Sequence, residues 1–135
     1  MGEYQALFSR FAGSCDGLVH ITIGSGFSAC YQNACLAAAG FPNVRVVDSR
    51  NLSTGQGHVV LEACRLRDAG LSVEEAARIL TDLRKTARIF FTVGSFDYIQ
   101  HGGRVGKMTG LAGALLNVKP LITLQDGEIH SSGIR

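Results

Sequence analysis

The stretch over residues 18–31 constrains the fold more than any other part of the sequence. It begins with the apolar run Leu18–Ile23, continues through Gly24-Ser-Gly26, and enters a segment with small and apolar residues at helical spacing. A short apolar run of this kind is typical of a buried strand, and closely spaced glycines mark a turn. The sequence therefore predicts a strand, a tight turn and a helix over 28–39 in direct succession, with Ser28 as the helix N-cap residue.

This turn is a candidate anion-binding site, because free backbone N–H groups and the positive end of a helix dipole meet at one point. Two interpretations of this turn remain open at this stage. One involves no bound anion, and the other does. In the first, the glycines only turn the chain and Ser28 only caps the helix. In the second, Gly24-x-Gly26-x-x-Ala29 is a dinucleotide-binding fingerprint, with Asp48 at about the position of the ribose-binding acid. The chain would then be a module that binds NAD(P).

The remaining patterns follow an order typical of an α/β protein. They predict helices over 3–12, 55–68, 72–86, 96–100 and 106–116, and strands over 44–47, 88–93 and 119–125. Ser72 and Glu75 form a capping-box pattern at the start of one helix. A helical crossover makes the strands over 18–23 and 44–47 parallel, and Asp126-Gly127 is a hairpin signal. We therefore predict a parallel sheet with crossover helices over residues 1–93 and a second α/β subdomain over 94–135 that ends in a β-hairpin.

Composition excludes several classes of function. With 135 residues, 18% of them charged and a net charge of +2, the chain is long enough for a packed core and too weakly basic for a typical nucleic-acid binder. The start of the chain has no leader pattern and no stretch is long and apolar enough to span a membrane, which predicts a cytoplasmic protein. The four cysteines have neither zinc-ligand nor CxxC spacing, and the four histidines do not cluster, so we expect reduced thiols and no metal site.

Two further patterns bear on ligand binding. Gly102-Gly-Arg-Val-Gly-Lys107 has the composition of a phosphate loop, but its spacing is one residue short of a Walker A motif and Met108 stands where that motif has Ser or Thr. Small residues also recur at every fourth position over 106–114. Such a stripe either lets helices pack closely or leaves a slot for an apolar ligand. A slot near an anion-binding turn would suit an amphiphile with an acidic head group.

Six motifs, taken together, resemble the DegV family of fatty-acid-binding proteins. In chain order they are Ser25-Gly-Phe-Ser-Ala-Cys-Tyr-Gln-Asn-Ala34, Val44-Arg-Val-Val-Asp-Ser49, Gly55-Gln-Gly57 with Val60-Leu-Glu-Ala63, Gly102-Gly-Arg-Val-Gly-Lys107, Asn117-Val-Lys-Pro120 and Asp126-Gly-Glu-Ile129. Any one of them would be a weak signal. Six in the same order over essentially the whole chain outweigh the dinucleotide fingerprint, which explains nothing after Asp48.

The resemblance implies a two-domain α/β carrier that buries a long-chain fatty acid between its domains and has no catalytic activity of its own. It also implies a partner, a separate fatty acid kinase subunit that receives the bound acid, and no cofactor beyond that acid. By match to the family motifs, the Ser28 hydroxyl would bind the fatty-acid carboxylate, Ser25, Gly26 and the Ala29 backbone would complete the turn, and Arg104 would lie near the head group.

Members of the family are about twice as long, and this chain resembles their middle part. The resemblance therefore implies a truncated member, with an incomplete first domain over 1–93 and the beginning of a second domain over 94–135. An incomplete sheet has an unpaired edge, which can be closed by self-association. A homo-oligomer is thus a further expectation, and a ligand-free self-associating fragment is the third functional alternative.

Overall fold

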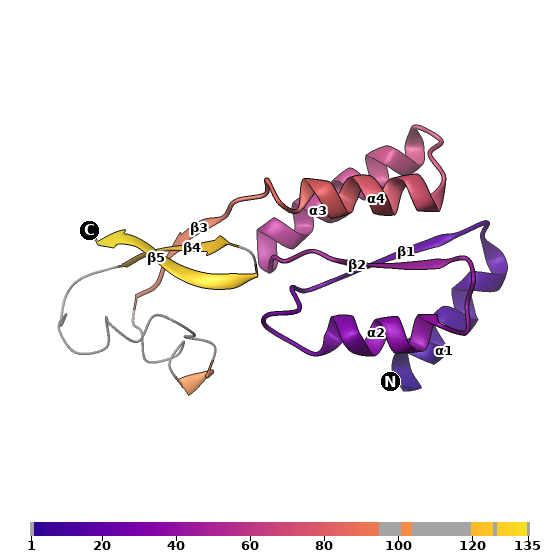
Figure 1. The fold of residues 1–135 in the computed structure, drawn as a ribbon, viewed down its shortest axis with the longest axis horizontal. Coiled ribbons are helices and arrows are strands. Elements are labelled where there is room, and N and C mark those ends of the chain that lie inside the picture. Colours follow the sequence, from indigo (N-terminus) through magenta and orange to yellow (C-terminus); the bar gives the residue numbers. More distant parts are fainter. Residues whose placement is uncertain (1, 95–100, 104–119, 126, 135) are drawn as a thin grey trace. The chain divides into compact units, whose positions relative to one another are not determined.

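A computed structural model of the chain describes residues 2–94, 101–103, 120–125 and 127–134. The chain divides into two compact units, residues 1–87 and residues 88–135 (Figure 1). The first unit is an α/β layer structure, and the second contains a small antiparallel sheet. The predicted fold class, with a parallel sheet and crossover helices followed by a C-terminal hairpin, is confirmed.

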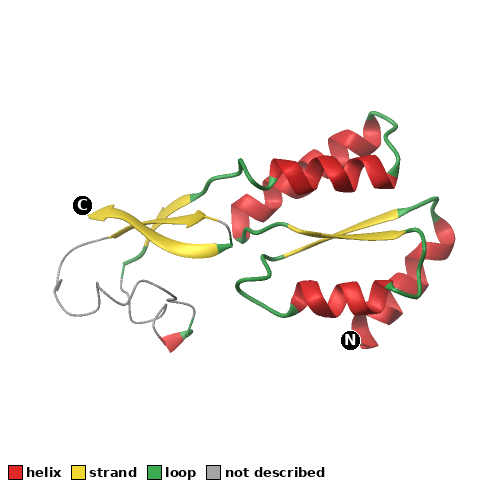
Figure 2. Cartoon of the chain, in the orientation of Figure 1, coloured by secondary structure: helices red, strands yellow, loops and turns green. Residues whose placement is uncertain are grey.

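The first unit is a two-stranded parallel sheet covered by helices on both faces (Figures 1 and 2). Strands β1 and β2 pair in parallel, with Leu18 opposite Val44 and Thr22 opposite Asp48. Helices α1 and α2 lie on one face of the sheet, and α3 and α4 lie on the other. The elements are α1 (Gly2–Phe11), a 3-10 turn (Ala12–Ser14), β1 (Leu18–Thr22), α2 (Cys30–Ala38), β2 (Val44–Asp48), α3 (Ser53–Asp68) and α4 (Val73–Leu83).

Alternation along the strands produces two separate cores, because successive side chains of a strand point to opposite faces. Val19, Ile21 and Val47 pack against α3 and α4 around the fully buried Val59 and Leu80. On the other face, α1 and α2 enclose a second core that is built from Phe8, Ala34, Ala37 and Val44, with Leu18 and Val46 against it. The sheet is thus buried on both faces, as parallel sheets usually are.

The capping box predicted at the start of α4 is confirmed. The backbone N–H of Glu75 donates to Ser72 Oγ at 3.3 Å, and the backbone N–H of Ser72 donates to Glu75 Oε2 at 3.0 Å. These two hydrogen bonds satisfy backbone donors that have no partner within the helix. The Ser72 hydroxyl also donates to Glu75 Oε2 at 2.6 Å. This bond, and then the bond from the Ser72 backbone N–H, lower the pKa of the Glu75 carboxyl, because a bonded carboxylate is stabilised in its charged form.

An aromatic cluster joins α1 to β1. The His20 ring lies edge-on to Tyr4 and to Phe8, with ring centroids 5.4 and 5.3 Å apart, and Phe41 closes the cluster at 5.9 Å from Phe8. Burial among these rings lowers the pKa of His20, because removal from water disfavours the imidazolium. His20 is therefore a neutral member of an apolar cluster.

We expect this histidine to make the fold less stable in acid. The pKa of His20 is lower in the folded chain than its ordinary value of about 6.5, so the unfolded chain binds the proton more tightly. Its contribution to stability is complete above about pH 6.5 and is lost as the pH falls through that value toward the folded pKa. Urea unfolding at pH 7.5 and 5.5 should show a smaller acid loss in His20→Leu than in the parent chain. His58→Gln, at an exposed position of α3, is the control and should keep the parent's loss.

The second unit contains three antiparallel strands, β3 (Phe90–Thr92), β4 (Pro120–Gln125) and β5 (Glu128–Ile134). The predicted hairpin is present between β4 and β5, and Gly127 adopts the positive φ of 79° that the turn requires. β3 pairs with β4 and not with the parallel sheet, so the strand predicted over 88–93 belongs with the residues that follow it. The helices predicted over 96–100 and 106–116 lie outside the described residues, and the assignment of 1–93 and 94–135 to two domains stays a prediction.

Candidate functional site

The loop between β1 and α2 lies directly against the loop that follows β2. The backbone N–H of Gly24 donates to the Asn51 carbonyl at 2.8 Å, and the backbone N–H of Ser49 donates to the Thr22 carbonyl at 3.2 Å. A Cβ atom at Gly24 would lie 3.0–3.1 Å from the Arg50 and Asn51 backbone, which is tighter than an ordinary contact. Gly24 is therefore required by the close approach of two backbones, and this requirement needs no ligand.

Asp48 joins the two loops through hydrogen bonds. Its carboxylate accepts hydrogen bonds from the Ser25 backbone N–H (3.0 Å), the Ser25 hydroxyl (2.7 Å) and the Arg50 backbone N–H (2.9 Å). Arg84, the C-cap residue of α4, donates to the Asp48 carbonyl at 2.8 Å, and its guanidinium lies 3.8 Å from the carboxylate. Asp48 is only 5% exposed. A carboxylate that is buried and bonded in this way is not presented to the hydroxyls of a ribose, so the geometry gives the dinucleotide interpretation no support.

Ser28 lies at the start of α2, but it is not the N-cap residue. The helix begins at Cys30 with Ala29 in the N-cap position, and Ala29 has no side chain that could cap. Ser28 Oγ instead accepts a hydrogen bond from the Cys30 backbone N–H at 3.3 Å and donates one to Cys30 Sγ at 3.0 Å. The predicted N-cap role was therefore wrong by one residue, although the hydroxyl still serves a first-turn N–H group. Thiols are weak acceptors, so this hydroxyl proton can be redirected to a better acceptor at small cost.

Cys30 gives this turn a chemical character that sequence reasoning missed. Hydrogen bonds from the Ser28 hydroxyl and then from Tyr4 lower the pKa of the Cys30 thiol, because both stabilise the thiolate. The same interaction raises the pKa of Tyr4, whose hydroxyl proton is held by Cys30. The lowered pKa of the Cys30 thiol therefore indicates that the groups around the start of α2 stabilise negative charge. The signal available in the sequence was the position of Cys30 at the predicted helix start.

The turn also presents backbone donors. Among the described residues, the N–H groups of Gly26 and Ala29 have no hydrogen-bond partner, and both residues are exposed. Together with the Ser28 hydroxyl and the dipole of α2, they can stabilise one anionic oxygen group. The structure thus brings Gly26, Ser28 and Ala29 together, whereas the Ser25 hydroxyl is already bonded to Asp48. Arg104, the fifth predicted ligand residue, lies outside the described residues. The ligand-binding roles of all five stay predictions.

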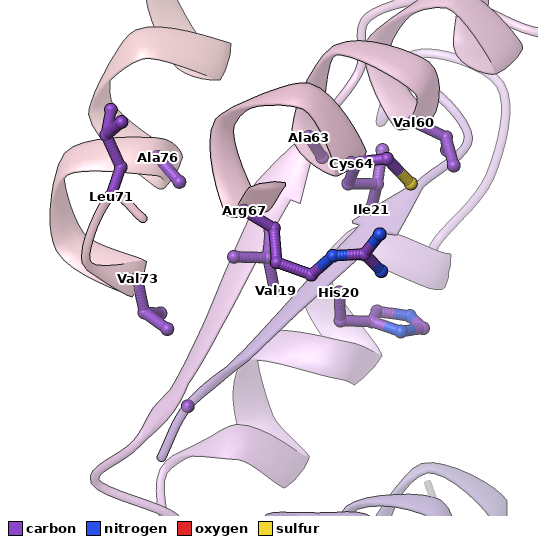
Figure 3. Close-up of a pocket in the computed structure, with 11 residues that line it drawn as sticks. Val19, His20, Ile21, Val60, Ala63, Cys64, Arg67, Leu71, Val73 and Ala76 are labelled. Carbon is purple, nitrogen blue, oxygen red and sulfur yellow. The ribbon is translucent and has the colours of Figure 1, made fainter. Parts of the chain in front are cut away.

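A second feature of the first unit is a groove of about 380 Å³ along β1 (Figure 3). Its walls are mainly apolar and come from β1, α3 and the beginning of α4. The lining residues are Gly17, Val19, His20, Ile21, Val60, Ala63, Cys64, Arg67, Leu71, Val73 and Ala76. The predicted turn residues do not line this groove.

Two features are absent from the described part of the chain. No group of three or more His, Cys, Asp or Glu side chains there could hold a metal ion. No helix of that part is long and apolar enough to cross a membrane. All four cysteines of the chain are free.

Known proteins of the same fold match the chain over nearly its whole length. A structure described as fatty-acid binding of a DegV family protein from Thermus thermophilus covers 98% of this chain, with a TM-score of 0.90 and 32% identity. A stearic-acid-binding protein from Eubacterium ventriosum covers 99% of this chain, with a TM-score of 0.88 and 37% identity. A DegV domain-containing protein of Caldanaerobacter subterraneus is 33% identical over 129 residues.

These relatives are longer than the present chain. The match covers 46% of the Caldanaerobacter protein and 48% of each of the two structures, so the chain spans about half the length of the proteins it matches. The family described as "Uncharacterised protein, DegV family" matches residues 1–133. With this match and the six motifs in the same order, the chain belongs to the DegV family.

Proposed function

We propose that this chain binds a long-chain fatty acid and holds its carboxylate at the turn that precedes α2. The observation that carries the proposal is the set of donors at this turn, namely the Ser28 hydroxyl and the unpartnered N–H groups of Gly26 and Ala29. An ionised carboxylate is costly to remove from water unless such donors replace its hydration. The stearic-acid-binding relative and the Thermus protein support the choice of a fatty acid among possible anions.

The side chains of Asp48 and Arg84 stabilise the conformation of this turn. Asp48 fixes Ser25 through two hydrogen bonds, and the Arg84 guanidinium, 3.8 Å away, offsets the charge of Asp48. The ligand carboxylate would therefore bind on the Ser28 side of the turn. The nearby Asp48 carboxylate is already hydrogen-bonded, and Arg84 partly neutralises its charge. This division of roles favours Ser28 over Ser25 as the direct ligand contact.

The proposed role is that of a carrier. The donors at the turn can bind and orient a carboxylate, and the activation of that carboxylate is assigned to a separate fatty acid kinase subunit, as the family resemblance implies. No dinucleotide is needed in this scheme. Calorimetry with NAD(P) and Asp48→Ala provides the contrary test, since NAD(P) binding that depended on Asp48 would favour the alternative.

Native mass spectrometry of the purified chain, followed by identification of the small molecules released on denaturation, tests the proposal directly. A long-chain fatty acid bound in a fixed ratio to the chain is the expected result. A chain that carries no lipid, and that does not take up added stearate, would contradict fatty-acid binding by this half-length chain.

Replacement of Ser28 by alanine should weaken fatty-acid binding by roughly tenfold or more, because a hydrogen bond to a charged group contributes about 1.5–3 kcal/mol. Displacement of a fluorescent fatty-acid analogue by stearate measures the effect. Ser9→Ala, an exposed serine on α1, is the matched control and should leave the affinity unchanged. Equal affinities for Ser28→Ala and the parent chain would remove Ser28 from the site.

A further inference from the structure

Two ion pairs join β2 to α4, one near each end of the strand. Near the beginning of both elements Arg45 and Glu74 lie 2.6 Å apart, and their side chains are 38% and 62% exposed. At the end of both elements Asp48 and Arg84 lie 3.8 Å apart, and their side chains are only 6% and 16% exposed. Water screens the first pair well and the second pair poorly, so the charges of Asp48 and Arg84 act more strongly on nearby groups.

Fold stability alone gives no reason for the guanidinium of Arg84 at this position. The transfer of two charges out of water costs free energy that their attraction restores only when their hydrogen bonding is complete. Arg84 Nη1 donates to the Asp48 carbonyl at 2.8 Å, but the buried Arg84 Nε has no hydrogen-bond partner among the described residues. A buried guanidinium with an unsatisfied donor indicates a role for its charge.

The turn that precedes α2 supplies such a role. Asp48 accepts hydrogen bonds from the N–H and hydroxyl groups of Ser25, and the donors proposed for the ligand, Gly26, Ser28 and Ala29, follow in the same turn. A bound carboxylate would therefore be a second negative charge close to Asp48. Like charges in a partly buried site repel each other, and this repulsion would weaken the binding of an anion unless a positive charge lay nearby.

Tyr31, the second residue of α2, indicates that both charges reach the first turn of this helix. The pKa of Tyr31 is raised, first by its hydrogen bond with Cys35 and then by burial. Asp48 raises this pKa further and Arg84 lowers it, because a carboxylate repels the tyrosinate anion and a guanidinium attracts it. The two charges therefore act in opposite directions on an anion at the start of α2.

We propose that Arg84 is a positioning residue for the ligand carboxylate, and that it balances the charge of Asp48 so that a turn fixed by a buried carboxylate can bind an anion. The inference rests on the proposed fatty-acid function and adds to it the origin of the charge preference. Asp48 fixes the shape of the turn through Ser25, and Arg84 makes that shape selective for an ionised head group. Without Arg84, the same donors would lose their preference for a carboxylate over a hydroxyl.

Two ligands of equal chain length that differ in head-group charge test the inference. We expect Arg84→Gln to bind myristate roughly tenfold or more weakly than the parent chain does, and to bind 1-tetradecanol as the parent does. Displacement of a fluorescent fatty-acid analogue, whose own dissociation constant is measured for each variant, gives the affinities. Arg84→Lys keeps the charge and should keep most of the preference for myristate. Arg45→Gln removes the exposed charge between the same two elements and should leave both affinities unchanged.

Replacement of Asp48 by asparagine distinguishes an effect of charge from an effect of shape. The N–H groups of Ser25 and Arg50 donate to Asp48 Oδ1, which asparagine retains, and the Ser25 hydroxyl that donates to Oδ2 can accept from the asparagine amide instead. The double variant with Asp48→Asn and Arg84→Gln removes both charges and should regain most of the myristate affinity that Arg84→Gln loses. Asp48→Asn alone should bind myristate more tightly relative to 1-tetradecanol, and it provides the test if circular dichroism shows that Arg84→Gln does not fold.

The ratio of the two affinities separates this role of Arg84 from simple support of the fold. A ratio in Arg84→Gln equal to that of the parent chain would overturn the inference, since a purely structural residue affects both ligands alike. The absence of recovery in the double variant, or an unchanged ratio in Asp48→Asn, would also overturn it. A parent chain that binds neither ligand would instead contradict the fatty-acid proposal itself, and the inference about Arg84 would fall with it.

Discussion

Replacement of Asp48 by alanine should lower the free energy of unfolding by about 3–5 kcal/mol, the cost of breaking a buried ion pair from one side. Asp48 is 5% exposed and the Arg84 side chain 16%, so the change leaves a guanidinium buried without its counter-charge. It also removes the acceptor for the Ser25 hydroxyl, the Ser25 N–H and the Arg50 N–H. Urea unfolding followed by circular dichroism gives the measurement.

An exposed ion pair of the same unit is the matched control. Arg45 and Glu74 lie 2.6 Å apart, but the Glu74 side chain is 62% exposed. Glu74→Ala should therefore cost less than about 1 kcal/mol. If Asp48→Ala were as mild as Glu74→Ala, then Asp48 would not be the structural support of the turn, and its carboxylate would again be available for a ligand.

The local elements could be predicted from the sequence because each depends on neighbours along the chain. Apolar periodicity located α1, α3, α4 and the paired strands to within a few residues, and the capping box at Ser72 was predicted with both of its partners. The parallel pairing of β1 and β2 followed from the helix between them. The hairpin at Asp126-Gly127 followed from turn chemistry alone.

The site was harder to predict because its contacts join residues that are distant in sequence. Asp48 matched a ribose-binding acid by spacing, whereas in the fold it bonds Ser25, 23 residues earlier, and pairs with Arg84 at the end of α4. Gly24 matched a phosphate-binding glycine, but the approach of the Arg50 backbone explains it. β3 looked like a third parallel strand, yet its partner is β4, about thirty residues later.

Replacement of Phe8 by alanine should cost about 3–5 kcal/mol of unfolding free energy, as is usual for a fully buried aromatic residue. Phe8 is 0% exposed and is in contact with the rings of Tyr4, His20 and Phe41. The loss combines the apolar area with a cavity that its neighbours fill only in part. Leu36→Ala, at a leucine that is 59% exposed on α2, should change the stability by less than about 1 kcal/mol.

The same variant has a second consequence that a general loss of packing does not predict. Burial among these rings is what lowers the pKa of His20, so a cavity that admits water should return that pKa toward its ordinary value. Phe8→Ala should thus be less stable than the parent chain at every pH, but should lose less further stability between pH 7.5 and 5.5. Titration of the His20 ring by NMR measures the pKa directly. A large loss of stability with an unchanged His20 pKa would mean that the cavity stays dry and that Phe8 acts through packing alone.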